Sequence, residues 1–259
     1  MKKANITRLA TLLIFAVVLV AALTLYNFVF RGNSDALWQI VSQNCTLGHA
    51  APPATGVCLK VDKKHQYVLF KASNGPHHDL LMPTFPVAGL ESTVLDAPAT
   101  PPFIAIAWAE RGRLAKEAGF PIRDEDMSLA INSRLGRSQN HLHIHIACLH
   151  ASVKESLARQ ANSITFQWSA IPEPIMGKHY FAKRIAGERL DLENPIVILN
   201  DFLRSEGRLP GSFGLGLARL DNGDFVLLAK GNSLFPYDLG STGRLQDFTC
   251  AVAQKSKQP

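Results

Sequence analysis

The sequence has no internal repeats and no low-complexity tract, and only 4 of its 259 residues are cysteine. A hydrophobic fraction of 47% excludes a disordered chain and is enough to build a large core. The Gly214-Leu215-Gly216 stretch lacks the strand, helix and acidic residue of a dinucleotide fingerprint. The spaced basic and aromatic pattern of a nucleic-acid module is also missing, so no nucleic-acid partner is expected.

Charged residues are missing from Leu9 to Phe30. As a helix these residues would extend roughly 33 Å, about the thickness of a hydrocarbon core, which predicts one transmembrane helix. A cleaved signal peptide is the alternative, because Val20-Ala21-Ala22 resembles a cleavage site, but the apolar run continues past it. We therefore expect residues 1–32 to form a cytoplasmic tip and anchor, and residues 33–259 a catalytic domain with a C-terminal extension.

Basic residues are distributed unevenly around this run. Lys2, Lys3 and Arg8 precede it, whereas Arg31 is followed by a long segment without basic residues. This asymmetry predicts a single-pass protein with a cytoplasmic N-terminus and an exported domain. The net charge of +6 suits anionic partners such as phosphates or acidic lipid headgroups.

The four cysteines form an even set, as expected for disulfides in an exported domain. We favour Cys45 with Cys58, because the short loop between them is rich in glycine and proline, and this leaves Cys148 with Cys250. Free buried thiols remain the alternative.

The elements predicted from periodicity are mixed strands and helices without regular βαβ alternation. Apolar and turn residues predict strands at 57–61, 67–70, 77–83, 128–131, 141–149, 180–185, 213–220 and 225–229. Helices are predicted at 101–119, 152–161 and 194–203. The fold class is therefore α+β, with an antiparallel sheet and packed helices.

Three histidines alternate with apolar residues at His141, His143 and His145. In a strand, these imidazoles share one face while the residues between them face the core. Neighbouring same-face residues lie about 6.5–7 Å apart, which suits a central nucleophile with two neighbours better than a compact metal tripod. A neutral imidazole can form a covalent phosphoramidate, so His143 is the predicted nucleophile.

The loop before the triad carries hydrogen-bond donors and cations that could stabilise charge on a phosphate. The predicted substrate-binding residues are Asn132, Arg134, Arg137, Gln139 and Asn140, and Ser138 is predicted to take part in catalysis.

Two other interpretations of the histidines stay open, a metal site and histidines that merely pack. Zinc enzymes also use histidines two apart on a strand, so an exported metal-binding or zinc-dependent protein is an alternative. The remaining histidines are interpreted as surface or structural residues, and among them the pair His77-His78 adjoins a predicted strand.

The motif His141–Ala147 resembles the histidine-triad superfamily, in which three histidines alternate with apolar residues. Asn132 and Gly136-Arg137-Ser138 are similar to the asparagine and Gly-Gln-Ser-like stretch that precede the triad there, with arginine in place of glutamine. Many members have a further histidine just after an upstream strand that ends in proline. Here Phe85 and Pro86 follow Pro83, so no fourth histidine is assigned.

Within that superfamily, the anchor, the Asn132–Gln139 run and the C-terminal extension are similar to the bacterial CDP-diacylglycerol pyrophosphatase family. The resemblance implies a HIT-like fold and the hydrolysis of CDP-diacylglycerol to CMP and phosphatidate, with no cofactor, metal or obligate protein partner. It implies that the anchor lies in a bacterial inner membrane and that the catalytic domain is periplasmic. It implies that His143 forms a CMP-histidine intermediate. It also implies that His141 and His145 orient the ring and handle the leaving-group proton, and that Ser138 binds the phosphate. A histidine-triad hydrolase of a soluble nucleotide, and a non-enzymatic envelope protein, are the remaining alternatives.

Overall fold

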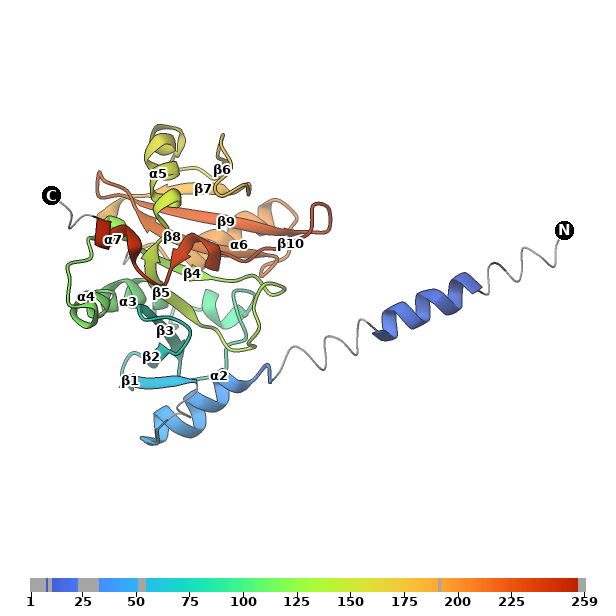
Figure 1. Ribbon diagram of the computed structural model, residues 1–259, viewed down its shortest axis with the longest axis horizontal. Coiled ribbons are helices and arrows are strands. Elements are labelled where there is room, and N and C mark those ends of the chain that lie inside the picture. Colours follow the sequence, from blue (N-terminus) through green and yellow to red (C-terminus); the bar gives the residue numbers. More distant parts are fainter. Residues whose placement is uncertain (1–7, 9–10, 23–32, 51–54, 191, 256–259) are drawn as a thin grey trace.

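The strands of the computed structural model, which describes Arg8 and residues 11–22, 33–50, 55–190 and 192–255, form one large antiparallel sheet. The strand order is β1-β2-β3-β5-β4-β8-β9-β7-β6, with β10 beside β9 and β11 beside β5 (Figure 1). The strands are β1 (Gly56–Asp62), β2 (Tyr67–Ala72), β3 (His78–Pro83), β4 (Met127–Ile131), β5 (Ile144–Leu149), β6 (Ser169–Ala170), β7 (Phe181–Ile185), β8 (Phe213–Arg219), β9 (Phe225–Ser233), β10 (Asp238–Leu239) and β11 (Gln246–Asp247).

Helices lie between the strands in sequence. The α-helices are α2 (Ala36–Gln39), α3 (Phe103–Glu110), α4 (Gly112–Ala118), α5 (Ala151–Gln160), α6 (Pro195–Ser205) and α7 (Ala251–Lys255). A π-helical turn, η1 (Ile40–Asn44), continues α2. The 3₁₀ turns are η2 (Cys45–Leu47), η3 (Thr93–Asp96), η4 (Asp124–Asp126), η5 (Ala161–Ser163), η6 (Gly187–Arg189) and η7 (Gly243–Leu245).

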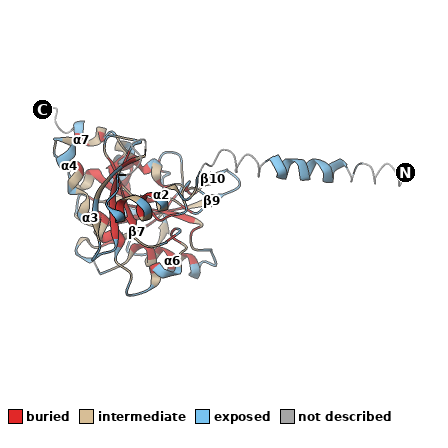
Figure 2. Cartoon of the chain, turned by 90° about the horizontal axis from the view of Figure 1, so that it is seen from below, coloured by how far each residue is buried: buried red, intermediate tan, exposed pale blue. Residues whose placement is uncertain are grey.

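One face of the sheet packs against α3 and α6. Ile144 and Ile146 of β5 share a buried apolar cluster with Trp108 of α3 and Leu199 of α6. Period-two alternation sends these β5 side chains to one face and their neighbours to the other. Figure 2 shows the buried residues concentrated in the strands behind the covering helices.

Two helical segments cover the two ends of the opposite face. The α2–η1 segment packs on β2 and β3 in one apolar cluster, and α5 packs toward β8 and β9 in another. His143 and His145 have the parity of this face, between the two covers.

Local signals account for several boundaries. Asn194 caps α6 by accepting from the amide of Ile196 at 3.0 Å, and Pro195 begins the helix. Gly223 has φ +89° in the β8–β9 hairpin, a value that favours glycine. The helix predicted over 101–119 ends at Gly119 as expected, but is divided into α3 and α4 at Arg111 and Gly112.

The predicted transmembrane helix over residues 9–30 is wrong. The helical residues described in that range are 11–22. Across the described parts of the chain, no helix has the length and apolar character needed to cross a membrane. Residues 9, 10 and 23–30 of the predicted helix lie outside the described residues. The prediction of a single-pass inner-membrane protein depended on this helix and is corrected with it.

Both favoured cysteine pairings are confirmed. Cys45 is bonded to Cys58, which ties the end of the α2–η1 segment to β1. Cys148 of β5 is bonded to Cys250, which ties the C-terminal segment to the centre of the sheet. The two bridges close loops of different length, with sequence separations of 13 and 102.

This difference predicts unequal contributions to stability. In the loop-entropy account, a disulfide destabilises the unfolded chain more when it closes a longer loop. We expect Cys148→Ser/Cys250→Ser to lower the free energy of unfolding by about 5 kcal/mol, and Cys45→Ser/Cys58→Ser by about 3 kcal/mol. Urea unfolding of the two double variants measures both losses in the free energy of unfolding. Equal losses would contradict the loop-length argument for this chain.

Candidate active site

The triad lies at the start of β5 rather than inside it. The strand begins at Ile144, so the prediction of a strand from His141 onward is wrong for residues 141–143. β3 ends at Pro83, and the amide of Leu142 donates instead to the carbonyl of Val87 at 2.6 Å. Leu142 still packs in the apolar core with Ile144 and Ile146, so the predicted alternation of side chains holds.

His143 is held by its own chain. Its Nδ1 lies 2.7 Å from the backbone oxygen of His141. A carbonyl oxygen only accepts hydrogen bonds, so Nδ1 carries the proton and Nε2 of the neutral ring keeps its lone pair. The hydrogen bond therefore selects the tautomer in which Nε2 is unprotonated.

His145 pairs with His78, a residue from β3. His78 Nε2 lies 2.8 Å from His145 Nδ1, and His78 Nδ1 lies 2.6 Å from the side-chain oxygen of Asn74. With Asn74 accepting, His78 Nδ1 donates and its Nε2 accepts, so His145 Nδ1 must be protonated. The remaining His145 Nε2 is buried without a partner and keeps a free lone pair.

The His143 and His145 rings lie edge to face, with centroids 5.0 Å apart. His141 lies apart from them. Its Nε2 is 3.0 Å from the carbonyl of Pro83, and its ring packs against Trp38. Of the three triad side chains, two therefore meet and the third anchors the loop to the end of β3.

Burial keeps these rings neutral. Desolvation lowers the pKa of His78 and that of His141 to about 4. Burial also lowers the pKa of His143, with the charge of Arg137 acting in the same direction and the hydrogen bond to His141 acting against it. The pKa of His145 lies well below its usual range, through burial and then through its histidine neighbours.

A cavity of about 260 Å³ opens over His143 and His145. One wall is apolar and comes from α2–η1 and β2, and the histidines and loop residues form the polar part. The lining residues are Ala36, Leu37, Ile40, Thr55, Phe70, Ala72, Ser73, Asn74, His78, Leu80, Ser138, Gln139, His143 and His145.

The predicted loop residues are distributed unequally around this cavity. Ser138 and Gln139 line it, and Ser138 is exposed. The side-chain amide of Gln139 donates to the carbonyl of Asn33 at 3.0 Å and accepts from the backbone amide of Leu37 at 3.1 Å. Gln139 therefore joins the loop to α2.

The other predicted substrate-binding residues do not line the cavity. Asn132 accepts from the amides of Thr242 and Gly243 and from the Ser241 hydroxyl, so it caps a C-terminal turn. Arg134 and Asn140 are exposed.

Arg137 is buried beside the site. It makes a bidentate ion pair with Glu91, with contacts of 2.8 and 2.6 Å. Its charge therefore acts on His143 through space.

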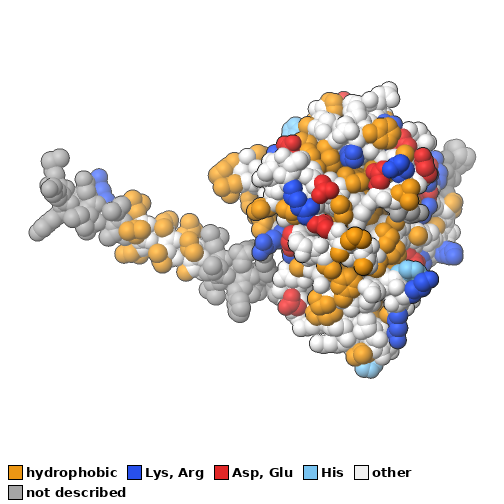
Figure 3. Space-filling view, turned by 180° about the vertical axis from the view of Figure 1, so that it is seen from behind, with side chains coloured by type: hydrophobic (Ala, Val, Ile, Leu, Met, Phe, Trp, Pro, Cys, Tyr) orange, Lys and Arg blue, Asp and Glu red, His pale blue; other side chains and the backbone are white. Residues whose placement is uncertain are grey.

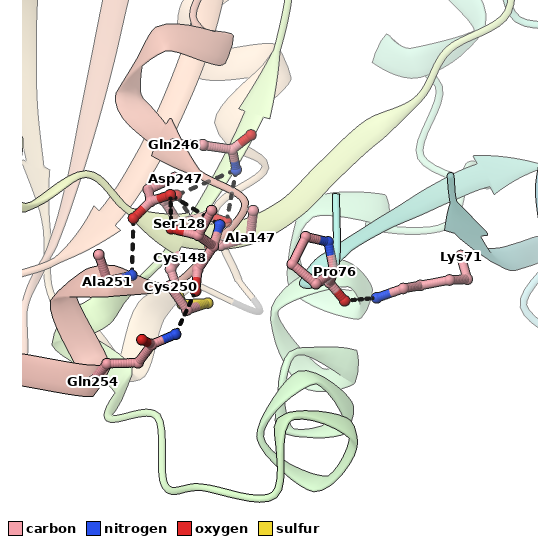
Figure 4. Close-up of a disulfide and its surroundings, with 11 residues drawn as sticks. Lys71, Pro76, Ser128, Ala147, Cys148, Gln246, Asp247, Cys250, Ala251 and Gln254 are labelled. Atoms are coloured by element: carbon pink, nitrogen blue, oxygen red, sulfur yellow. Dashed lines mark hydrogen bonds between the residues drawn. A yellow bond between two sulfur atoms is a disulfide. The ribbon is translucent and has the colours of Figure 1, made fainter. Parts of the chain in front are cut away.

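The C-terminal segment packs against the histidine pair. Phe248 stacks on the His78 ring with centroids 3.8 Å apart, and its carbonyl accepts from the amide of His77. The Gln246 side chain donates to the backbone oxygen of His145 at 3.3 Å. Figure 4 shows Gln246 beside Ser128, and Cys250 beside Cys148 of β5. The disulfide therefore holds the segment that supports His78.

His78 and Phe248 are the neighbours of the triad that sequence reasoning missed. A weak signal existed, because His78 shares the parity of Leu80 and Met82 in the predicted strand. The register that places His78 opposite Ala147 is a long-range pairing, however, and no local pattern specifies it.

The zinc alternative requires several ligands around one point. Within residues 33–50, 55–190 and 192–255, no three His, Cys, Asp or Glu side chains are arranged to hold a metal ion.

Comparison with known proteins gives a consistent family assignment. A family model described as CDP-diacylglycerol pyrophosphatase matches residues 32–254. A CDP-diacylglycerol pyrophosphatase of Yersinia pestis is 39% identical over 244 residues, covering 94% of this chain and 93% of that protein. Among solved structures, a DUF4931 family protein from Bacillus cereus is 12% identical, with a TM-score of 0.38, covering 66% of this chain and 83% of that chain.

The buried histidines predict acid sensitivity of the fold. Unfolded imidazoles have a pKa of about 6.5, whereas the pKa of folded His78 and that of folded His141 are about 4. Below about pH 6.5 the unfolded chain binds more protons, so the free energy of unfolding should fall between about pH 7 and pH 4.5. The free energy of unfolding of His141→Phe, measured with urea, should fall less over this interval. That of the control His179→Phe, a change at an exposed position, should fall as it does in the wild type. An unchanged loss in His141→Phe would contradict this assignment.

Proposed function

This chain belongs to the CDP-diacylglycerol pyrophosphatase family, and from that premise we propose that it hydrolyses the phosphoanhydride of CDP-diacylglycerol to CMP and phosphatidate, with His143 as nucleophile. The observation that carries the proposal is the hydrogen bond from His143 Nδ1 to the carbonyl of His141. It leaves Nε2 as the nitrogen with a lone pair on a ring that lines the cavity.

In the first step, His143 Nε2 attacks the phosphorus on the cytidine side. The new N–P bond forms as the bridging P–O bond breaks, so CMP becomes attached to the histidine and phosphatidate leaves. The lowered pKa of His143 favours this step, because a neutral ring near pH 7 retains the attacking lone pair. The carbonyl of His141 accepts a stronger hydrogen bond as positive charge develops on the ring.

In the second step, water attacks the same phosphorus and the N–P bond breaks, which releases CMP and restores Nε2. The water must give up a proton, and His145 Nε2 is a buried, unpartnered acceptor beside His143. His78 and Asn74 fix the opposite nitrogen of His145 as the donor, which keeps Nε2 free to act as a base. The proton then passes from His145 to solvent.

Charge on the phosphates needs donors close to the nucleophile. Ser138 lines the cavity, is exposed and precedes the triad, so its hydroxyl is the proposed donor to a phosphate oxygen. Arg137 contributes positive charge near His143 from behind the cavity, in its pair with Glu91. Gln139 positions the loop against α2, and Asn132 positions it against residues 241–243.

The likeness to the histidine-triad superfamily belongs to this proposal. It is supported by the motif His141–Ala147 and by the roles the geometry allows to each ring. In this assignment, His141 is a positioning residue whose backbone oxygen holds the nucleophile and whose side chain bonds the end of β3.

The proposal predicts that His143→Ala loses activity by about 10³-fold or more, because the variant lacks the nitrogen proposed to form the N–P bond. Purified protein is incubated with CDP-diacylglycerol labelled in the cytidine phosphate, and CMP and phosphatidate are quantified with and without chelator. Acid-labile label should remain on the wild-type protein after rapid quenching, and none on the variant.

His65→Ala is the matched control, since this histidine is exposed and lies far from the cavity. Normal turnover in the His143→Ala variant would exclude His143 as the nucleophile. Loss of activity in chelator, restored by zinc, would favour the metal-dependent alternative instead. Faster hydrolysis of a soluble nucleoside diphosphate ester than of the lipid would overturn the proposed substrate.

The pH dependence of the reaction should follow the neutral form of His143. Because burial lowers the pKa of His143, kcat/KM should stay constant through neutrality and fall in acid with an apparent pKa below about 6.5. Initial rates over a pH series measure this profile, within the range where unfolding experiments show the protein intact. An acid limb centred above the ordinary histidine pKa would contradict the assignment of a buried, neutral nucleophile.

A further inference from the structure

Large apolar side chains are exposed on loops at one end of the sheet, where β4 and β9 finish and β5 and β8 begin. Their exposed fractions lie between 46% and 88%. We call this set the apolar rim, and its members are Leu135, Met176, Leu209, Leu234, Phe235 and Tyr237. Figure 3 shows hydrophobic side chains projecting from the corresponding margin of the globular part, with basic side chains beside them. Exposed apolar groups gathered in this way mark an interaction site.

Hydrogen bonds join the loops of the rim into one surface. The amide of Arg134 donates to the carbonyl of Gly211 at 2.8 Å, and the amide of Ser133 donates to that of Gly240 at 3.3 Å. The amide of Asn232 donates to Ser212 at 3.0 Å, which ties the β9 end to the 206–212 loop. Backbone hydrogen bonds therefore connect the loops of the rim, and the apolar side chains lie at the tips of these loops.

Basic residues alternate with the apolar tips. Arg134 precedes Leu135, and Arg208 precedes Leu209. A pocket of about 200 Å³ at the base of the β9–β10 hairpin is lined by Lys178, Lys230 and Arg244, with Asp238 as its acidic residue, and also by Tyr237, Leu239 and Ser241.

Asp238 is shared by Lys178 at 2.8 Å and Lys230 at 2.6 Å. With three basic residues and one acidic residue, the pocket keeps a net positive charge. Glu206, on the neighbouring loop, is a further acidic residue that does not line it. Such a surface complements anionic groups.

The rim and the catalytic cavity share the loop that leads into the triad. Residues 133 and 134 bond the rim loops, whereas Ser138 and Gln139 of the same loop line the cavity. Whatever binds the rim is thus brought to the end of the sheet where His143 lies.

We propose that the apolar rim docks this protein onto the surface of a phospholipid bilayer that carries anionic headgroups. The choice of a lipid surface rests on the proposed function, because a substrate with two acyl chains stays in the bilayer and the enzyme must meet it there. Aromatic and aliphatic loop tips enter the interfacial region, and the basic residues between them contact phosphate groups. The docking is a surface contact and requires no membrane-spanning helix.

A second copy of the chain and a protein partner are the competing occupants. Stable protein interfaces bury a continuous, well-packed patch of about 800 Å² on each partner. The rim instead consists of separate projecting tips with cations between them, a composition typical of interfacial membrane binding.

The test uses the full chain with a local reporter. Phe235→Trp places an indole at the tip with the largest exposure, and Phe166→Trp is the matched control, an exposed phenylalanine between α5 and β6. Tryptophan fluorescence emission is measured in the presence of substrate-free vesicles of phosphatidylcholine and phosphatidylglycerol, with and without bromine on the acyl chains. The signal of native Trp38, Trp108 and Trp168 is subtracted using the wild type. We expect bromine quenching and a blue shift for Phe235→Trp, and neither for Phe166→Trp.

Equal responses at the two positions, or none at Phe235, would overturn the proposal. A concentration-dependent dimer that is lost in Phe235→Ser would assign the rim to a second copy and overturn it as well. Because these vesicles contain no substrate, the result does not depend on whether the protein hydrolyses CDP-diacylglycerol.

A kinetic arm measures what docking contributes. Phe235→Ser should lower kcat/KM by about tenfold on substrate embedded in vesicles, because the variant lacks an aromatic side chain that docking buries in the bilayer. It should leave kcat/KM unchanged on a short-chain, water-soluble analogue. Phe166→Ser should change neither value. Equal losses on both substrates would mean that Phe235 acts on the fold or the site rather than on docking.

Discussion

The hydrogen bond between His143 Nδ1 and the carbonyl of His141 is the constraint on which the site depends. It spans only two residues, and both precede the start of β5 at Ile144. A regular strand would have directed that carbonyl to a neighbouring strand. The segment before β5 thus provides the carbonyl that selects the tautomer of His143 with an unprotonated Nε2.

Around this bond, buried histidines are kept neutral and oriented by one another. Desolvation makes their charged forms costly, while Asn74, His78 and the carbonyl of Pro83 satisfy individual ring nitrogens. The C-terminal segment completes the arrangement, since Phe248 covers one face of His78 and the bridge from Cys148 to Cys250 holds that segment on β5. Fold stability and the electrostatics of the site therefore involve the same residues.

The same end of the sheet combines two unlike surfaces. The cavity is a small, partly polar hollow between the covering helices, and the rim beside it consists of exposed apolar tips with cations. The loop between β4 and β5 connects them, so chemistry and docking would be coupled by one hydrogen-bonded segment of the chain. This arrangement suits an amphiphilic substrate whose reacting phosphates lie next to its insoluble part.

The sequence by itself determined the features that follow from local periodicity and composition. Alternation placed Leu142, Ile144 and Ile146 in the core, Asn194-Pro195 began α6, and the short Cys45–Cys58 loop indicated both disulfides. Only the tertiary structure decided which side chains meet. His78 reaches His145 through the register of β3 on β5, and Arg137 pairs with Glu91 from a distant loop, because strand pairing and ion pairing join residues far apart in sequence. An uncharged run likewise specifies apolar character alone, and in the part of the chain that the structure describes no helix is long and apolar enough to cross a membrane.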